Sequence, residues 1–211
     1  MKKVLALLIA TGAVMAIACS TPVLAGDPVS VGDSIFINDR EGSTPGGEFG
    51  VTTSLEGPDL FRTFCVQRDE PIDFTSPFVI TGISTIALEQ GDPLDYRTAW
   101  LYTQFRAGTL PGYNYTPNSP ARIESANALQ QAIWYIEQEQ AIVYTPLAQQ
   151  FVNLANNAGW TDLGQVRVLN LRYVTGAPAQ DILVLEPVPE PTSMALAGLG
   201  IAAILKLRRR K

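Results

Sequence analysis

The chain of 211 residues is long enough for one domain with a hydrophobic core. Its formal charge of −5 is unevenly spread, because seven of the 15 basic residues lie in the two ends. Residues 26–188 keep eight arginines against nineteen acids, a formal charge of about −11, and contain no lysine or histidine. This charge argues against nucleic acid as a partner. The missing histidine excludes a Ser-His-Asp triad, a Cys-His dyad and a His-ligated zinc site.

The first 25 residues have the pattern of a signal peptide. Lys2 and Lys3 precede an apolar run over residues 4–18, and Val23-Leu24-Ala25 is a small-residue cleavage pattern. We therefore expect an exported chain whose mature domain begins near Gly26. The residues before Cys19 match a lipoprotein cleavage site only weakly. We therefore rank lipidation of Cys19 second to cleavage near Gly26.

Four strands are predicted in the first half of the mature domain, where short runs rich in Val, Ile, Thr and Phe alternate with turns. They span residues 30–38, 49–55, 60–67 and 77–87. Gly82, inside the fourth run, indicates a bulge or a close approach of the backbone.

Three helices are predicted next, because the apolar spacing changes to i, i+3, i+4, i+7. They span residues 92–107, 121–139 and 145–156. Asp92-Pro93 is interpreted as the cap and first-turn proline of the first helix, and Glu137 and Glu139 as a solvated face of the second. Strand spacing returns over residues 165–174 and 180–185. This order predicts one α+β domain over residues 26–187, a mostly antiparallel, barrel-like sheet with a three-helix insertion.

Cys65 is the only cysteine of residues 26–187. A lone thiol in an oxidising compartment has no disulfide partner within its chain. It is therefore buried and inert, paired between chains, or used in other chemistry. Free cysteine is among the most buried residue types, so inert burial is the plainest of these readings.

Three short motifs bear on this choice. Phe64-Cys65 is an aromatic-cysteine pair on an early strand, and Leu129 to Trp134 (LQQAIW) places Gln130 before Ala-Ile-Trp on the best predicted helix. Ala179 to Leu183 (AQDIL) places Gln180 on the last strand. Together these motifs resemble the thioester domain family of bacterial surface adhesins.

This resemblance implies that the Cys65 thiol attacks a glutamine amide, expels ammonia and leaves an internal thioester. The acyl group then passes to an amine or hydroxyl of a partner. By strand position we expect the bond between Cys65 and Gln180, with Gln130 as the second choice, and with Phe64 and Trp134 supporting the site. Gln67 lies on the same strand face as Cys65 but is too close in sequence for such a crosslink.

The C-terminal end carries a three-part signal. Pro189, Glu190 and Pro191 precede an apolar run and a terminal basic cluster. This order resembles the PEP-CTERM sorting signal, which implies processing by an exosortase after transient anchoring through residues 194–207. Residues 188–211 are thus predicted to be a sorting and anchor segment.

Two functions follow from these patterns. The first is an exported surface or matrix binding protein that attaches covalently through the thioester. The second is a structural component of the extracellular polymer matrix with the same fold and no thioester. We expect no enzyme, no metal site and no cofactor, because the sequence has neither a serine-elbow motif nor a metal-ligand cluster.

Overall fold

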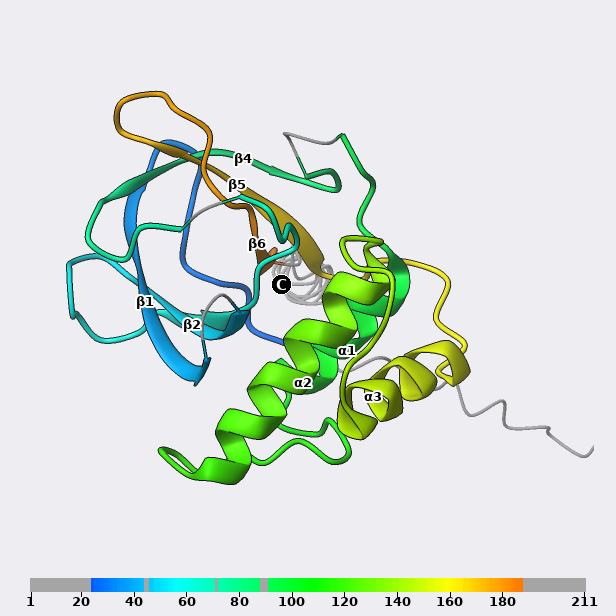
Figure 1. Ribbon diagram of the computed structural model, residues 1–211. Coiled ribbons are helices and arrows are strands. Elements are labelled where there is room, and N and C mark those ends of the chain that lie inside the picture. The colour runs from blue at the N-terminus through cyan, green and yellow to red at the C-terminus, as the bar shows by residue number, and fades with distance from the viewer. Residues whose placement is uncertain (1–23, 44–45, 71, 88–90, 188–211) are drawn as a thin grey trace, which may run out of the picture.

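The computed structural model describes residues 24–43, 46–70, 72–87 and 91–187 (Figure 1). Most of the predicted signal peptide and the predicted sorting segment, including Pro189, Glu190 and Pro191, lie outside these ranges. The strands are β1 (Ser34–Ser43), β2 (Gly46–Thr52), β3 (Phe61–Thr63), β4 (Phe78–Ser84), β5 (Val166–Tyr173) and β6 (Ile182–Leu185). The helices are α1 (Tyr96–Arg106), α2 (Pro120–Ile136) and α3 (Pro146–Asn157).

The six strands form one antiparallel sheet in the order β3-β2-β1-β4-β5-β6. The sheet curls into a nearly closed barrel, because the chain after β3 returns to β6. There Cys65 pairs with Ile182, and Leu183 N–H donates to the Phe64 carbonyl at 3.0 Å. We call this junction of residues 64–67 with residues 180–183 the barrel seam. The predicted α+β class with a mostly antiparallel, barrel-like sheet is confirmed.

The bulge indicated by Gly82 is present. The register of β4 against β5 shifts between Ile80 and Gly82. A Cβ atom at Gly82 would lie 3.0 Å from Oδ1 of Asn170 on β5, so the two strands approach closely at this point.

The three helices form the predicted insertion between β4 and β5, and pack together on one side of the sheet (Figure 1). Ser119 and Thr145 cap α2 and α3 with their side-chain oxygens, each followed by a proline in the first turn. The prediction that Asp92 caps α1 is wrong. Asp95 is the cap and accepts from Arg97 N–H, because Pro93 is held in an isolated bridge with Ile86 before the helix begins.

The sheet separates two hydrophobic cores, since side chains alternate between its faces. The barrel core lies inside the curl and includes Ile35, Ile37, Phe49, Phe78, Ile80, Leu169 and Ile182. The helical core lies between the other face and the helices and includes Leu101, Tyr102, Phe105, Leu129, Ile133 and Phe151. Phe64 and Cys65 are adjacent in sequence and therefore enter different cores: Phe64 the helical core, Cys65 the barrel core.

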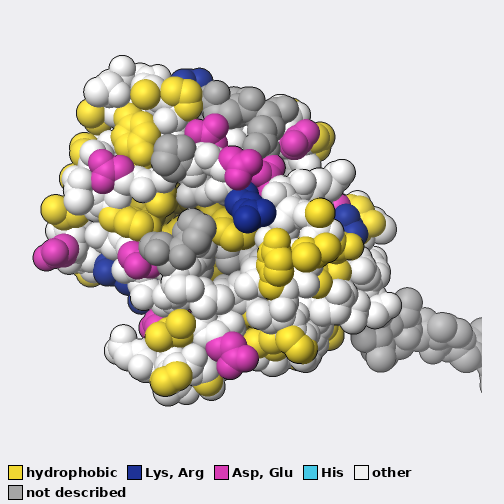
Figure 2. Space-filling model, in the orientation of Figure 1, with side chains coloured by type: hydrophobic (Ala, Val, Ile, Leu, Met, Phe, Trp, Pro, Cys, Tyr) yellow, Lys and Arg dark blue, Asp and Glu magenta, His cyan; other side chains and the backbone are white. Residues whose placement is uncertain are grey.

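The two ends of the described chain lie side by side. A side-chain carbon on Gly26 would collide with Pro187, and Asp27 N–H donates to the Leu185 carbonyl at 2.8 Å. The buried Asp27 carboxylate also binds Arg106 of α1 at 2.7 Å. The predicted signal peptide and the C-terminal segment therefore adjoin neighbouring points of the domain. Figure 2 shows acidic side chains spread over the visible face, in keeping with the negative charge of the domain. Among the described residues, no helix is long and apolar enough to cross a bilayer.

Candidate functional site

Cys65 is fully buried in the barrel seam, with 0% of its surface exposed. Burial raises the pKa of its thiol well above the usual value, and the negative charge of Glu139 adds to this effect. The polar indole N–H of the nearby Trp134 lowers this pKa and partly offsets the shift. The thiol is therefore neutral at physiological pH, and it is shielded from solvent.

Gln130 of α2 contacts this thiol with its side chain. Its Oε1 accepts from Cys65 Sγ at 3.3 Å and from Cys65 N–H at 3.2 Å. Its Nε2 donates to the Cys65 carbonyl at 2.9 Å. The amide thus pairs with both main-chain groups of Cys65, as a neighbouring strand would. This explains how a glutamine beside the apolar stripe of α2 is fully buried.

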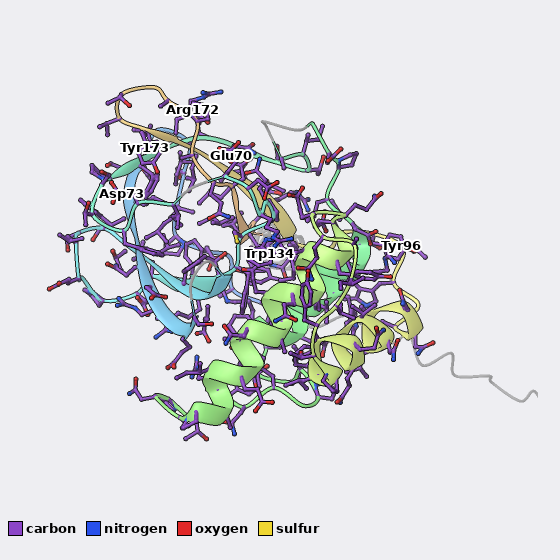
Figure 3. The ribbon with its side chains drawn as sticks, in the orientation of Figure 1. Glu70, Asp73, Tyr96, Trp134, Arg172 and Tyr173 are labelled. Carbon is purple, nitrogen blue, oxygen red and sulfur yellow. The ribbon has the colours of Figure 1, made fainter. Side chains whose placement is uncertain are left out.

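Gly46 of β2 lets α2 approach the seam. A Cβ atom at this position would lie 2.5 Å from the Trp134 ring and 2.6 Å from Cγ of Gln130. Trp134 closes one side of the barrel core, and its indole N–H donates to the Gln67 carbonyl at 3.0 Å. Figure 3 shows Trp134 at the junction of α2 with the sheet. Both α2 residues singled out in the sequence, Gln130 and Trp134, therefore reach the seam.

Gln180 lies on the opposite side of the seam and is 2% exposed. Cys65 pairs in an isolated bridge with Ile182, two residues after Gln180, and the Val66 N–H donates to the Asp181 carbonyl at 3.2 Å. Gln180 Nε2 donates to the Gln67 carbonyl at 2.6 Å. Gln180 thus belongs to the seam together with Cys65 and Gln130.

Beside the seam lies an acidic hollow that the sequence did not reveal. A cavity of about 10 Å³, large enough for one water, is lined in part by Gln67, Asp92, Glu137 and Glu139. A larger cavity of about 270 Å³ adjoins it and shares Asp92 and Glu137. No group of three or more acidic, cysteine or histidine side chains within the described ranges is arranged to hold a metal ion.

The interpretation of Glu137 as part of a solvated helix face is wrong. Glu137 is the C-cap of α2 and turns inward, where the Asp95 N–H donates to both carboxylate oxygens at 3.3 and 3.4 Å. Burial raises its pKa from 4.5 to about 7. Glu139 lies beyond the helix and accepts from Arg68 N–H at 3.0 Å. Both carboxylates therefore face the seam side of the molecule.

Comparison with known proteins bears on the end of the chain. A family model described as the PEP-CTERM protein-sorting motif matches residues 187–211. The C-terminal segment is therefore similar to PEP-CTERM sorting motifs. It supports an exported protein that is transiently anchored in the membrane and processed by an exosortase. No curated protein and no solved structure gave a match. The likeness of the central domain to thioester domains therefore stays a prediction from its motifs.

Sequence reasoning set Gln67 aside, yet it is central to the seam. Its Oε1 accepts a hydrogen bond from the Asp181 N–H at 2.9 Å. Its main-chain carbonyl accepts hydrogen bonds from the Trp134 indole N–H and from Gln180 Nε2. The signal was present in the sequence, because Gln67 stands two residues from Cys65 and so shares its strand face. The sequence alone does not show which residues near the last strand Gln67 contacts.

Proposed function

We propose that this exported chain forms an internal thioester between Cys65 and Gln180 and uses it to attach covalently to a surface or matrix partner. In the first step Cys65 Sγ bonds to Cδ of Gln180, the C–N bond breaks, and ammonia leaves with the thiol proton. In the second step an amine or hydroxyl of the partner attacks the same carbon, and the sulfur leaves as a thiol. No outside oxidant or cofactor is required.

The observation that carries this proposal is the position of Gln180 in the seam. Gln180 stands two residues before Ile182, the bridge partner of Cys65; Cys65 and Gln180 are both buried, and the carbonyl oxygen of Gln180 has no hydrogen-bond partner. A buried polar atom without a partner is uncommon in native structures and calls for an explanation. A thioester also lasts only where water and competing nucleophiles are kept away. A fully buried cysteine in a domain without lysine meets that need.

Gln130 is better suited to orienting Cys65 than to accepting its sulfur. Both ends of its amide already bind the main chain of Cys65, so converting Gln130 to an acyl group would break the 2.9 Å bond from its Nε2. Gln180 would lose only its bond to the Gln67 carbonyl. We therefore infer that Gln130 holds Cys65 in place while Gln180 supplies the acyl group. Because each chain reacts with its partner once, this function is attachment and not enzymatic turnover.

Intact-mass measurement tests the proposal. The full chain is produced with both targeting segments in a host that exports it, next to Cys65→Ala, Gln180→Ala and Gln130→Ala variants. The wild-type protein should be lighter by one ammonia than expected from the Cys65→Ala mass corrected for the substitution. Gln180→Ala should restore the full mass, and Gln130→Ala should retain the loss in part of the molecules. A full-mass wild-type protein removes the thioester, and a full loss in Gln180→Ala moves the bond to another glutamine.

A structural role in the matrix is the alternative, and one contact favours it. The Cys65 thiol donates to Gln130 within a packed core, which is the environment of an inert buried cysteine. Under this alternative, matrix retention is the same for the wild-type, Cys65→Ala and Gln180→Ala proteins. A clear drop in retention for both variants, with unchanged export and unfolding temperature, contradicts it.

A further inference from the structure

Three buried side-chain atoms in the described part of the chain have no hydrogen-bond partner, and two of them belong to side chains whose other ends bind across the seam. They are Nε2 of Gln67 and Oε1 of Gln180. One is a donor and the other an acceptor, and both residues are almost completely buried. An unpartnered donor and an unpartnered acceptor on two side chains of the same seam indicate a shared task.

The orientation of both amides is fixed by their other ends. Gln67 Oε1 accepts from Asp181 N–H at 2.9 Å, so reversing this amide would set two donors against each other. Gln180 Nε2 donates to the Gln67 carbonyl at 2.6 Å, so reversing that amide would set two oxygens together. The free atoms are therefore the NH₂ group of Gln67 and the carbonyl oxygen of Gln180.

We propose, on the basis of the thioester proposed above, that the side-chain NH₂ of Gln67 donates to the acyl oxygen of Gln180 during formation and transfer of the acyl group. When sulfur bonds to Cδ of Gln180, the carbonyl electrons move onto its oxygen, and they return when ammonia leaves. When a partner amine attacks the thioester, charge develops on the same oxygen and returns as the sulfur departs. One fixed donor therefore assists both steps.

The surroundings suit a donor of this kind. A hydrogen bond to developing negative charge is strongest where water is excluded and the donor needs no reorganisation. The seam excludes solvent from Cys65, Gln67 and Gln180, and Asp181 holds the Gln67 side chain in place. In the resting protein the donor has no other partner to give up. Loss of one such donor typically slows acyl chemistry by about 10²–10³-fold.

Gln67→Glu separates this role from a structural one. The new side chain keeps an oxygen for Asp181 N–H but loses the NH₂ group. Gln67→Met removes both functions with little change in volume, and Gln149→Glu, at an exposed position of α3, is the control for added charge. Each protein is exported as the full chain. Ammonia loss is measured by intact mass, the rate of mass gain is followed with methylamine as the probe, and unfolding is followed by circular dichroism.

We expect Gln67→Glu to form the thioester and, at a pH high enough to ionise the new buried carboxyl group, to consume methylamine about 10²–10³-fold more slowly than wild type, with Gln149→Glu unchanged. Relative to wild type at the same pH, the Gln67→Glu rate should recover in acid, because the protonated carboxyl group is again a donor. A purely structural Gln67 gives no such recovery. Wild-type rates in Gln67→Glu, or a relative rate independent of pH, overturn the inference.

Failure of the inference is distinguishable from failure of the thioester. If the wild-type protein has its full mass, both the thioester and the donor role of Gln67 are refuted. If the wild-type protein loses ammonia and the Gln67→Glu variant reacts at the wild-type rate, only the donor role of Gln67 is refuted. If neither Gln67 variant folds, NMR of the wild-type protein decides. The Gln67 side-chain amide signals should shift when methylamine opens the bond, and unmoved signals count against the donor role.

Discussion

Replacing Glu137 by glutamine should change how the stability of the domain depends on pH. The Glu137 pKa is about 7 in the folded protein and 4.5 without the fold, because burial disfavours its charged form. Below pH 4.5 both states hold the proton, so the group has no effect. As the pH rises toward 7, the unfolded chain releases the proton first, and the folded state loses stability.

The size of this effect follows from the two pKa values. At about 1.36 kcal/mol per pKa unit, the change from 4.5 to about 7 is worth roughly 3 kcal/mol. Glu137 is only partly buried, so screening by solvent reduces our expectation to about 2 kcal/mol. Glutamine keeps an oxygen for the Asp95 N–H and carries no charge at any pH. Neighbouring Asp95 and Arg97 are the same in both proteins, so their own titration largely cancels.

Urea unfolding at several pH values measures the difference. Wild type and Glu137→Gln should have similar free energies of unfolding near pH 4.5, and the variant should be more stable by about 2 kcal/mol near pH 8. The Glu124→Gln variant is the control, since Glu124 is exposed on the same helix. If the free energies of unfolding of wild type and Glu137→Gln differ by the same amount near pH 4.5 and near pH 8, Glu137 is not held in its protonated form by burial.

Three further substitutions test the framework of the site. Asp27→Ala leaves Arg106 unpaired in a largely buried position and should cost about 3 kcal/mol of unfolding free energy in urea. Glu48→Gln removes a carboxylate with 0% side-chain exposure that binds two arginines, and should cost about 3–5 kcal/mol, against almost no change for Glu124→Gln. Gly46→Ala pushes α2 away from the seam and should cost about 1–3 kcal/mol and reduce ammonia loss in the intact mass.

Most of the fold was readable from periodicity. Spacing of two placed the strands and spacing near 3.6 placed the helices, because each element buries one face. The start of α1 was misread because Asp92 and Asp95 are equally good caps, and the choice depends on Pro93 pairing with Ile86. Such a pairing between loops is set by the tertiary fold and leaves no local pattern.

The site was readable in part. The sequence singled out Cys65, Gln130 and Gln180, and the fold brings all three to the seam. The sequence did not reveal Gln67, because the role of Gln67 at the seam depends on contacts between segments about 115 residues apart in the chain. It also missed the burial of Glu137, because α2 ends one residue before it and the chain then turns inward.

The position of the proposed bond at the seam has a mechanical consequence. Cys65 follows β3 and Gln180 precedes β6, in the two segments that meet at the barrel seam, so a thioester between them ties a loop of about 115 residues. By the chain-entropy relation for crosslinks, such a loop stabilises the fold by up to about 5 kcal/mol. Opening the bond with methylamine should therefore lower the free energy of unfolding of the wild-type protein by an amount of this order.

Cys65→Ala should show the lower stability from the start and no response to methylamine. Equal stability of the wild-type protein before and after a complete mass gain would mean that the seam is held by its hydrogen bonds and packing alone. Attachment to a partner would then leave the barrel closed. With the expected loss, attachment instead exchanges an internal crosslink for an external one, and the seam becomes the first part of the barrel to open under load.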